Sequence, residues 1–314
     1  MATRRRHLAT LGLLGALVAL LTAPAAASAR STCLGQKATI VGSRGSNHIH
    51  GTAHRDVINA KGGADVVVTS GGRDIVCGGP GDDKLIGHND GEKLIGGTGD
   101  DYFDPDLGND LVIGDAFNPA GDATGPTGRD FVKGSGGRDF IVGDNYASGD
   151  ASAGGADDLD AGPGPDTIIG DSAATGSGSA TGGQDDHVRA MRGSDLIVGD
   201  SYSPSGAASG EGNDALNGDY KSDTIVGDSY TKTGTASGGG RDRVHGLWGN
   251  DFLYGDSVAA SATGRVVLGG GGQDVVVGAD GDDYLNGGPR HDICSGGSGH
   301  DVASATCEWL IQVP

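Results

Sequence analysis

A nine-residue repeat runs through most of this chain, and it constrains the fold more than any other feature of the sequence. Each copy follows the pattern G-G-x-G-x-D-x-U-x, in which U is a large apolar residue. The clearest copies are GGPGDDKLI (78–86), GGTGDDYFD (96–104), GADGDDYLN (278–286) and GGSGHDVAS (296–304). Glycine permits a tight turn with positive φ, and side chains alternate between the two faces of a short strand. The repeat therefore predicts a turn followed by a three-residue strand with one inward side chain.

Alignment on the sixth position of the repeat gives 22 copies, and this position is an aspartate in all but two of them, which carry Asn47 and Glu92. The aspartates are Asp56, Asp65, Asp74, Asp83, Asp101, Asp110, Asp130, Asp139, Asp157, Asp166, Asp186, Asp195, Asp214, Asp223, Asp242, Asp251, Asp274, Asp283, Asp292 and Asp301. The eighth positions, from Ile49 to Ala303, are nearly all β-branched or aliphatic, as an inward strand face requires.

The repeat predicts an all-β fold. It resembles the nonapeptide repeat of the RTX family, and this resemblance implies a parallel β-roll (β-solenoid) of about 22 nonapeptide half-coils, in which two repeats complete one coil. We expect uninterrupted roll over residues 42–113, roll with insertions over 114–268, and roll again over 269–304. Residues 30–41 are expected to form an N-terminal cap, in which Ala38 stands in the aspartate position of a degenerate copy. Residues 305–314 are expected to form the C-terminal cap, with Trp309 and Leu310 covering the last coil.

Six insertions interrupt the repeats between residues 114 and 268, and each follows an even-numbered copy. They span residues 114–124, 143–151, 170–180, 199–208, 227–236 and 255–268. All six should therefore emerge as a row of loops on one edge of the roll. Two interpretations stay open: they are tolerated surface loops, or they form a ladder that binds a cell-surface or glycan partner. Duplication of a 28-residue unit explains their mutual similarity equally well.

Residues 1–29 have the features of a secretion signal. Arg4, Arg5 and Arg6 precede an apolar stretch over 8–21, and Ala27-Ser28-Ala29 is an A-x-A cleavage motif. The alternative, a membrane anchor, is disfavoured because the apolar stretch is shorter than the ~20 residues that a membrane-spanning helix needs. We expect an extracellular protein that begins at Arg30 and has no membrane span.

The four cysteines, Cys33, Cys77, Cys294 and Cys307, would then lie in an oxidising compartment, where disulfides form. Three pairings are possible. We favour Cys33 with Cys77 and Cys294 with Cys307, as staples at the two ends of the roll. Free or intermolecular thiols are the alternative.

The charge of the chain is strongly negative, and the choice of acidic residue is informative. The formal net charge is −20, so nucleic acid and anionic membranes should be repelled. Among the 42 acidic residues, glutamate occurs only at 92, 211 and 308. A short carboxylate held close to a tight turn would be aspartate, so this bias favours ligands over a merely solvated surface.

A stacked array of carboxylates needs a compensating cation. Neighbouring like charges cost on the order of 1 to 4 kcal/mol per pair, and the 22 lysines and arginines stand at variable positions. Calcium accepts six to eight oxygen ligands, backbone carbonyls included, whereas magnesium requires tight octahedral geometry and zinc prefers histidine or cysteine. We therefore expect several Ca²⁺ ions, bound by the aspartates of the repeat.

The repeat resembles that of the RTX (haemolysin-type) calcium-binding nonapeptide family over roughly residues 42–304. The resemblance implies that each ion lies between one turn and the turn one coil later, bound by both aspartates and by glycine carbonyls. The implied pairs are Asp56 with Asp74, Asp65 with Asp83, Asp83 with Asp101, Asp139 with Asp166, Asp166 with Asp195, Asp195 with Asp223, and Asp283 with Asp301.

The resemblance leaves several sites open. Asn47 and Glu92 depart from the pattern. The longer turns of the insert edge leave it open whether Asp157, Asp186, Asp214 and Asp242 bind an ion. A Gly-Asp dipeptide opens these insertions and is a candidate to replace a lost ligand there, at Asp144, Asp171, Asp200, Asp228 and Asp256.

Signals for an enzyme are weak, and we expect none. Gly-Asp-Ser occurs four times, at 170–172, 199–201, 227–229 and 255–257. A single active site would need only one copy, so this repetition indicates repeat structure. His48, His50 and His54 stand at variable repeat positions; a transition-metal site there is the alternative to exposed side chains. The leading interpretation is a secreted calcium-binding protein with a structural or interaction role. An adhesin that uses the insertions is the first alternative, and a secreted hydrolase is a distant one.

Overall fold

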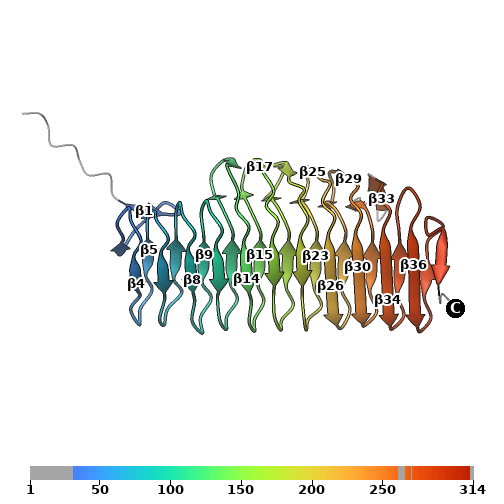
Figure 1. Cartoon of the computed structure of the whole chain (residues 1–314), viewed down its shortest axis with the longest axis horizontal. Helices are drawn as coiled ribbons and strands as arrows, with labels where there is room; N and C mark the ends of the chain where they lie inside the picture. The colour runs from blue at the N-terminus through green and yellow to red at the C-terminus, as the bar shows by residue number, and fades with distance from the viewer. Residues whose placement is uncertain (1–30, 261–265, 270, 312–314) are drawn as a thin grey trace, which may run out of the picture. The chain divides into compact units, whose positions relative to one another are not determined.

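The computed structural model describes residues 31–260, 266–269 and 271–311 of the chain. The expected secretion signal lies outside these residues. The described residues contain no helix; they form short strands that stack coil upon coil from the N-terminal to the C-terminal end of the repeats (Figure 1). No helix among them is long and apolar enough to cross a membrane.

Two parallel sheets of twelve strands each form the two faces of the solenoid. The first sheet consists of β4 (His48–His50), β6 (Val66–Val68), β8 (Lys84–Ile86), β10 (Tyr102–Asp104), β14 (Phe131–Lys133), β18 (Asp158–Asp160), β22 (His187–Arg189), β26 (Ala215–Tyr220), β30 (Arg243–Trp248), β34 (Val275–Asp280), β36 (Ile293–Ser298) and β38 (Trp309–Ile311). The second consists of β3 (Ile40–Val41), β5 (Val57–Asn59), β7 (Ile75–Cys77), β9 (Lys93–Ile95), β11 (Leu111–Ile113), β15 (Phe140–Val142), β19 (Thr167–Ile169), β23 (Leu196–Val198), β27 (Thr224–Val226), β31 (Phe252–Tyr254), β35 (Tyr284–Asn286) and β37 (Val302–Ala303). Odd-numbered copies of the repeat supply the first sheet and even-numbered copies the second, so the expected β-roll is confirmed.

The core between the two sheets is a single file of side chains from the eighth position of each repeat. Adjacent strands pair these positions directly, for example Leu85 with Phe103 and Phe103 with Val132. From Ile58 to Cys294 each of these side chains is fully buried, and Ile49 is buried to 8% exposure. One inward residue per strand suffices because the sheets are so narrow, which explains how a chain with 4% aromatic residues closes a core.

The N-terminal end of the stack is closed by an antiparallel hairpin of β1 (Thr32–Cys33) and β2 (Gln36–Lys37). Ile40 then pairs with Ile58, so the degenerate copy joins the second sheet in the register of the repeats. A disulfide joins Cys33 to Cys77 and holds the hairpin against the second sheet, as the sequence favoured.

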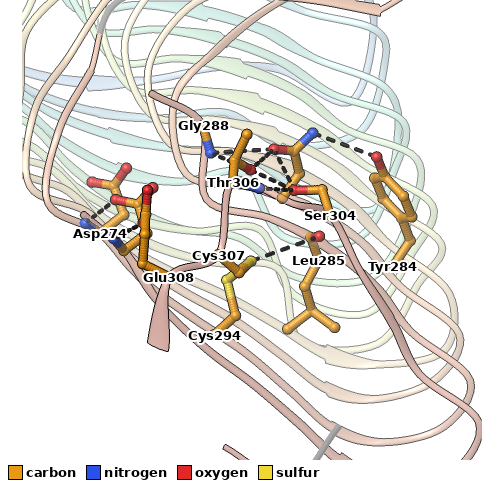
Figure 2. The surroundings of a disulfide bond; sticks show 11 residues. Asp274, Tyr284, Leu285, Gly288, Cys294, Ser304, Thr306, Cys307 and Glu308 are labelled. Atoms are coloured by element: carbon orange, nitrogen blue, oxygen red, sulfur yellow. Dashed lines mark hydrogen bonds between the residues drawn. A yellow bond between two sulfur atoms is a disulfide. The ribbon is translucent and has the colours of Figure 1, made fainter. Parts of the chain in front are cut away.

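The C-terminal end is closed differently from the expectation. Cys307 packs into the core and forms a disulfide with Cys294, which is the favoured pairing (Figure 2). Trp309 and Leu310, however, stay 67% and 57% exposed in β38. Trp309 pairs with the outward Ile293, so it lies outside the core and the expectation that it covers the last coil is wrong. The disulfide, rather than the tryptophan, seals this end.

The insertions do emerge in a row from one edge, but they are not loops. Their first halves form six parallel strands, β12 (Phe117–Asn118), β16 (Tyr146–Ala147), β20 (Ala173–Ala174), β24 (Tyr202–Ser203), β28 (Tyr230–Thr231) and β32 (Ser257–Ala260). A seventh strand, β33 (Val266–Gly269), comes from the end of the sixth insertion and pairs antiparallel with β32. Their second halves form a five-stranded sheet of β13 (Ala123–Thr124), β17 (Ala151–Ser152), β21 (Ala180–Thr181), β25 (Ala207–Gly210) and β29 (Thr235–Gly238). The chain thus extends each coil outward, as the upper tier of Figure 1 shows.

Side chains of the seven-stranded sheet form a second apolar core with the second large sheet. Tyr202 is 9% exposed and packs in one cluster with Val198 and Ile169. The rings of Tyr202 and Tyr230 stack with centroids 5.8 Å apart. Strands β11, β15, β19 and β23 carry apolar residues on both faces, because one face packs in the main core and the other in this second core.

Candidate metal centres

The repeat aspartates lie in two columns, one along each edge of the solenoid. The compact-edge column consists of Asp56, Asp74, Glu92, Asp110, Asp139, Asp166, Asp195, Asp223, Asp251, Asp283 and Asp301, each just before a strand of the second sheet. The insert-edge column consists of Asp65, Asp83, Asp101, Asp130, Asp157, Asp186, Asp214, Asp242, Asp274 and Asp292, each just before a strand of the first sheet. Every one of these acidic residues is buried.

In nearly all of these residues one carboxylate oxygen holds the preceding coil; Glu92 and Asp56 are the exceptions. The Oδ1 atom of Asp83 accepts a hydrogen bond from the backbone N–H of Asp65 at 2.7 Å, and the Oδ1 atom of Asp101 accepts one from Asp83 at 2.7 Å. The same bond recurs from coil to coil on both edges, as between Asp166 and Asp139 at 2.7 Å. It brings together every aspartate pair that the resemblance implies. Asp157, Asp186, Asp214 and Asp242 of the insert edge make it too.

The other carboxylate oxygen, Oδ2, has no hydrogen-bond partner among the residues that the structure describes. This holds for every aspartate of the two columns except Asp56, whose Oδ2 atom accepts hydrogen bonds from the backbone and hydroxyl of Thr52. Buried polar atoms are nearly always paired in folded proteins. A regular series of buried anionic oxygens without a donor therefore fits a row of cations as ligands.

Glycine at the first position of the repeat makes room for this oxygen. A Cβ atom on Gly143 would overlap both the Oδ2 atom of Asp157 and the carbonyl oxygen of Gly170 in the next coil. Gly278 stands in the same relation to Asp283 on the compact edge. Each such glycine thus marks a place where a carboxylate oxygen and a backbone carbonyl oxygen approach each other. At Gly143 and Gly278 a side chain would fill that place.

The electrostatics of the columns disfavour ionised carboxylates. Burial raises the pKa of Asp83 to about 7, that of Asp166 to about 8 and that of Asp101 to about 9. The backbone N–H of the preceding coil lowers each pKa in part, while the aspartate in that coil raises it further. A cation that lies against these oxygens would reverse this effect, because it stabilises the charged form.

The donor set fits calcium. Carboxylate and carbonyl oxygens are the ligands that Ca²⁺ uses, and its flexible coordination accepts several backbone carbonyls. Among the described residues no group of three or more His, Cys, Asp or Glu side chains converges as an all-side-chain metal site. In particular, His48 and His50 are exposed on β4.

Three acidic positions differ from the rest. Glu92 has one more methylene group, and neither of its carboxylate oxygens has a partner. Hydrogen bonds from Thr52 and Thr39 outweigh the effect of burial and lower the pKa of Asp56. At the C-terminal end Glu308 takes the place of an aspartate, and its Oε2 atom accepts the N–H of Asp292 at 2.8 Å (Figure 2). The sequence analysis missed this role of Glu308, although a sixteen-residue spacing from Asp292 is close to one coil.

The Gly-Asp-Ser serines are not accessible. Ser172, Ser201, Ser229 and Ser257 are fully buried. The hydroxyl of Ser229 accepts the N–H of Ser201 at 3.4 Å, and that of Ser257 accepts the N–H of Ser229 at 3.2 Å. These serines hold successive coils together, which accounts for their repetition.

Comparison with known proteins agrees with this geometry. The chain matches the family described as RTX calcium-binding nonapeptide repeat (4 copies) at residues 38–67, 50–85, 86–118, 124–145, 152–174, 209–229, 236–258 and 268–303. These segments together span more than half of the 314 residues. A search of curated proteins found no match.

Proposed function

This chain belongs to the RTX calcium-binding nonapeptide repeat family, and on that premise we propose that it is a secreted protein whose folding is driven by calcium. The ions bind between successive Asp-Gly turns of the two columns, and the role of the folded protein is structural or in interactions with other molecules. Family membership alone makes it a calcium-binding structural repeat protein.

The observation that carries the proposal is the row of buried Oδ2 atoms without a partner. An isolated buried carboxylate costs several kcal/mol, and the columns repeat this cost in every coil. Extracellular calcium sites have dissociation constants of ~10⁻⁴ to 10⁻³ M. At a tenfold excess of calcium over the dissociation constant, one ion adds ~1.4 kcal/mol to the free energy of unfolding. Several such ions are sufficient to decide whether the chain folds, since net stabilities are only ~5–15 kcal/mol.

Secretion is supported by two independent features. Residues 1–29 have the composition of an export signal. All four cysteines form disulfides, Cys33 with Cys77 and Cys294 with Cys307, and such bonds persist in oxidising compartments. N-terminal sequencing of the protein recovered from culture medium should begin at Arg30.

The insertions do not favour an adhesin over this proposal. Their alanines, serines and tyrosines are used in packing: Ala147, Ala151 and Ala180 are buried, as is Ser203. The similarity among the insertions follows from the requirement that each strand pair with its neighbour. The inaccessible Gly-Asp-Ser serines likewise give no support to a hydrolase.

Isothermal titration calorimetry on the mature chain tests the proposal. We expect several calcium ions per molecule to bind, with weaker binding of magnesium, which requires a tighter octahedral site. Absence of calcium binding at millimolar concentration would reject the proposal. Equal affinity for magnesium would reject the assignment of the columns as calcium sites.

A further inference from the structure

A third set of buried aspartates lies beside the insert-edge column and is not part of the nonapeptide pattern. It consists of the aspartates of the Gly-Asp dipeptides that open the six insertions, and we call it the Gly-Asp column. Its members are Asp115, Asp144, Asp171, Asp200, Asp228 and Asp256. Each is at most 1% exposed. They occupy the second position of a repeat, where two of the uninterrupted copies on the same edge have Gly79 and Gly97.

One carboxylate oxygen of each member closes its own insertion. Asp144 accepts the N–H of Gly155 at 2.9 Å, and Asp228 accepts the N–H of Gly240 at 2.8 Å. The donor is in every case the residue two positions before the next aspartate of the insert-edge column, where the insertion rejoins the roll. The Gly-Asp aspartates do not replace a lost repeat ligand, because the insert-edge column keeps its own aspartates and its own hydrogen bonds throughout.

The second carboxylate oxygen of each member has no partner. These atoms are Oδ1 of Asp115, Asp144 and Asp171 and Oδ2 of Asp200, Asp228 and Asp256. A carboxylate whose only task was to close the insertion would satisfy its second oxygen with solvent, as an exposed turn aspartate does. Here that oxygen is sealed inside the protein.

The carboxyl groups of the Gly-Asp column lie close to one another. Consecutive carboxyl groups lie within hydrogen-bonding reach of each other from Asp115 through Asp144, Asp171 and Asp200 to Asp228. Their backbones are fixed coil to coil, since the N–H of each donates to the carbonyl of the next, at 3.1 Å for Asp144 to Asp171.

The Gly-Asp column also adjoins the insert-edge column. A Cβ atom on Gly212 would lie 2.7 Å from Oδ1 of Asp200 and 2.8 Å from Oδ1 of Asp214, so two carboxylates from the two columns border one place. No lysine, arginine or histidine forms an ion pair with either column among the residues described.

We propose that the Gly-Asp column binds a second row of divalent, oxygen-preferring cations, best fitted by calcium, alongside the ions of the nonapeptide repeat. The proposal rests on the proposed function, because it assumes that calcium reaches the insert edge. It assigns to the coils of residues 114–274 a higher calcium capacity than to the uninterrupted coils. The insertions then serve to seal this additional row from solvent, with Gly-Asp as the first step of each.

Native mass spectrometry in calcium tests this, because it counts ions per folded molecule. Asp171→Asn and Asp200→Asn remove a charge from the middle of the column while an amide oxygen remains to accept the closing hydrogen bond. The matched control is Asp219→Asn: Gly218-Asp219 is the same dipeptide at the same repeat position on the compact edge, but it opens no insertion, and Asp219 is only half-buried.

We expect Asp171→Asn and Asp200→Asn each to lose at least one calcium ion per folded molecule, and Asp219→Asn to keep the wild-type number. An unchanged ion count in folded Asp171→Asn and Asp200→Asn would overturn the proposal, because the column would then be neutral and purely structural. Should both fail to fold, Asp115→Asn at the end of the column, with a single neighbour, gives the same comparison. A wild-type chain that binds no calcium would instead reject the proposed function itself.

Discussion

At the scale of single residues, the repeat divides its work between the two oxygens of one aspartate and the missing side chain of one glycine. The Oδ1 atom holds the next coil by accepting a backbone N–H, while Oδ2 stays free for a ligand. The glycine at the first position leaves the space in which Oδ2 and a carbonyl oxygen meet. This division explains why aspartate dominates the sixth position. Glu92 has a longer side chain, and neither of its carboxylate oxygens has a hydrogen-bond partner among the described residues.

Gly143→Ala tests the role of the first glycine. The new Cβ atom would overlap Oδ2 of Asp157 and the carbonyl oxygen of Gly170, so both packing and ion binding should suffer. We expect a loss of ~1–3 kcal/mol in the free energy of unfolding in calcium, as for other overpacked sites, and a higher calcium concentration at the midpoint of folding. Gly125→Ala is the control, since a Cβ atom there meets nothing within 4 Å. Equal midpoints for the two variants would contradict this role.

At the scale of elements, the insertions convert one face of a thin solenoid into a two-layered structure. The strands β16, β24 and β28 carry tyrosines that pack on the second large sheet, so its strands are buried on both faces. Parallel sheets covered on both faces read as continuous apolar runs, and the triplets Phe140–Val142 and Leu196–Val198 have that character. The insertions are thus structural elements of the coil and add a second apolar core to it.

Tyr202→Ala should reveal the energetic weight of this second core. Tyr202 is 9% exposed and stacks on Tyr230, and truncation of a buried aromatic side chain costs ~3–5 kcal/mol. Urea unfolding in saturating calcium measures the change. Tyr220→Ala is the control, because Tyr220 stacks on Trp248 at the compact edge yet is 43% exposed. If both variants lose the same stability, the inserted sheet does not form a core.

The structure could be predicted from the sequence where a regular residue pattern is compatible with only one arrangement of the chain. The roll and its core positions, such as Ile58 and Val76, follow from the period of nine. The two disulfides are the pairing that was favoured among three possible ones. Prediction failed where strand pairing is set by neighbours in space. Two-residue strands such as β16 have no period that sequence can reveal, and they exist because β12 and β20 flank them. Trp309 was misplaced because nothing local distinguishes an outward terminal strand from a cap. Asp115 was overlooked although its insertion, GDAFNPAGDAT, opens with the same Gly-Asp dipeptide as the others.

At the scale of the whole molecule, the protein stacks columns of carboxylates in a chain whose formal net charge is −20. Its stability should therefore depend on what neutralises those columns, either protons or metal ions. A chain with this charge and few bulky side chains tends towards disorder when neither is available. Repeat proteins gain stability from interfaces between neighbouring coils, so the same requirement applies along the entire stack.

The pH dependence of the calcium-free protein follows from the raised pKa values. Burial raises the pKa of Asp83, Asp166 and Asp101 from the ordinary 3.8 to about 7, 8 and 9. A carboxyl group whose pKa is raised in the folded state contributes its full stabilisation below the pKa that it has in the unfolded chain. This stabilisation is lost as the pH rises through the folded-state pKa. In chelator, we expect folded protein near pH 4 and progressive unfolding up to about pH 9. Each pKa unit by which a carboxyl group differs between the folded and unfolded states changes the free energy of unfolding by ~1.4 kcal/mol. A urea midpoint in chelator that rises over this range would contradict the assignment.

Far-ultraviolet circular dichroism of the mature chain at pH 7.5, with millimolar calcium and then with excess chelator, tests the central claim most directly. We expect the spectrum of a β-structure in calcium, that of a largely unfolded chain in chelator, and recovery when calcium is restored. Identical β-rich spectra in both solutions would show that the acidic columns are stable without metal, and would contradict the account.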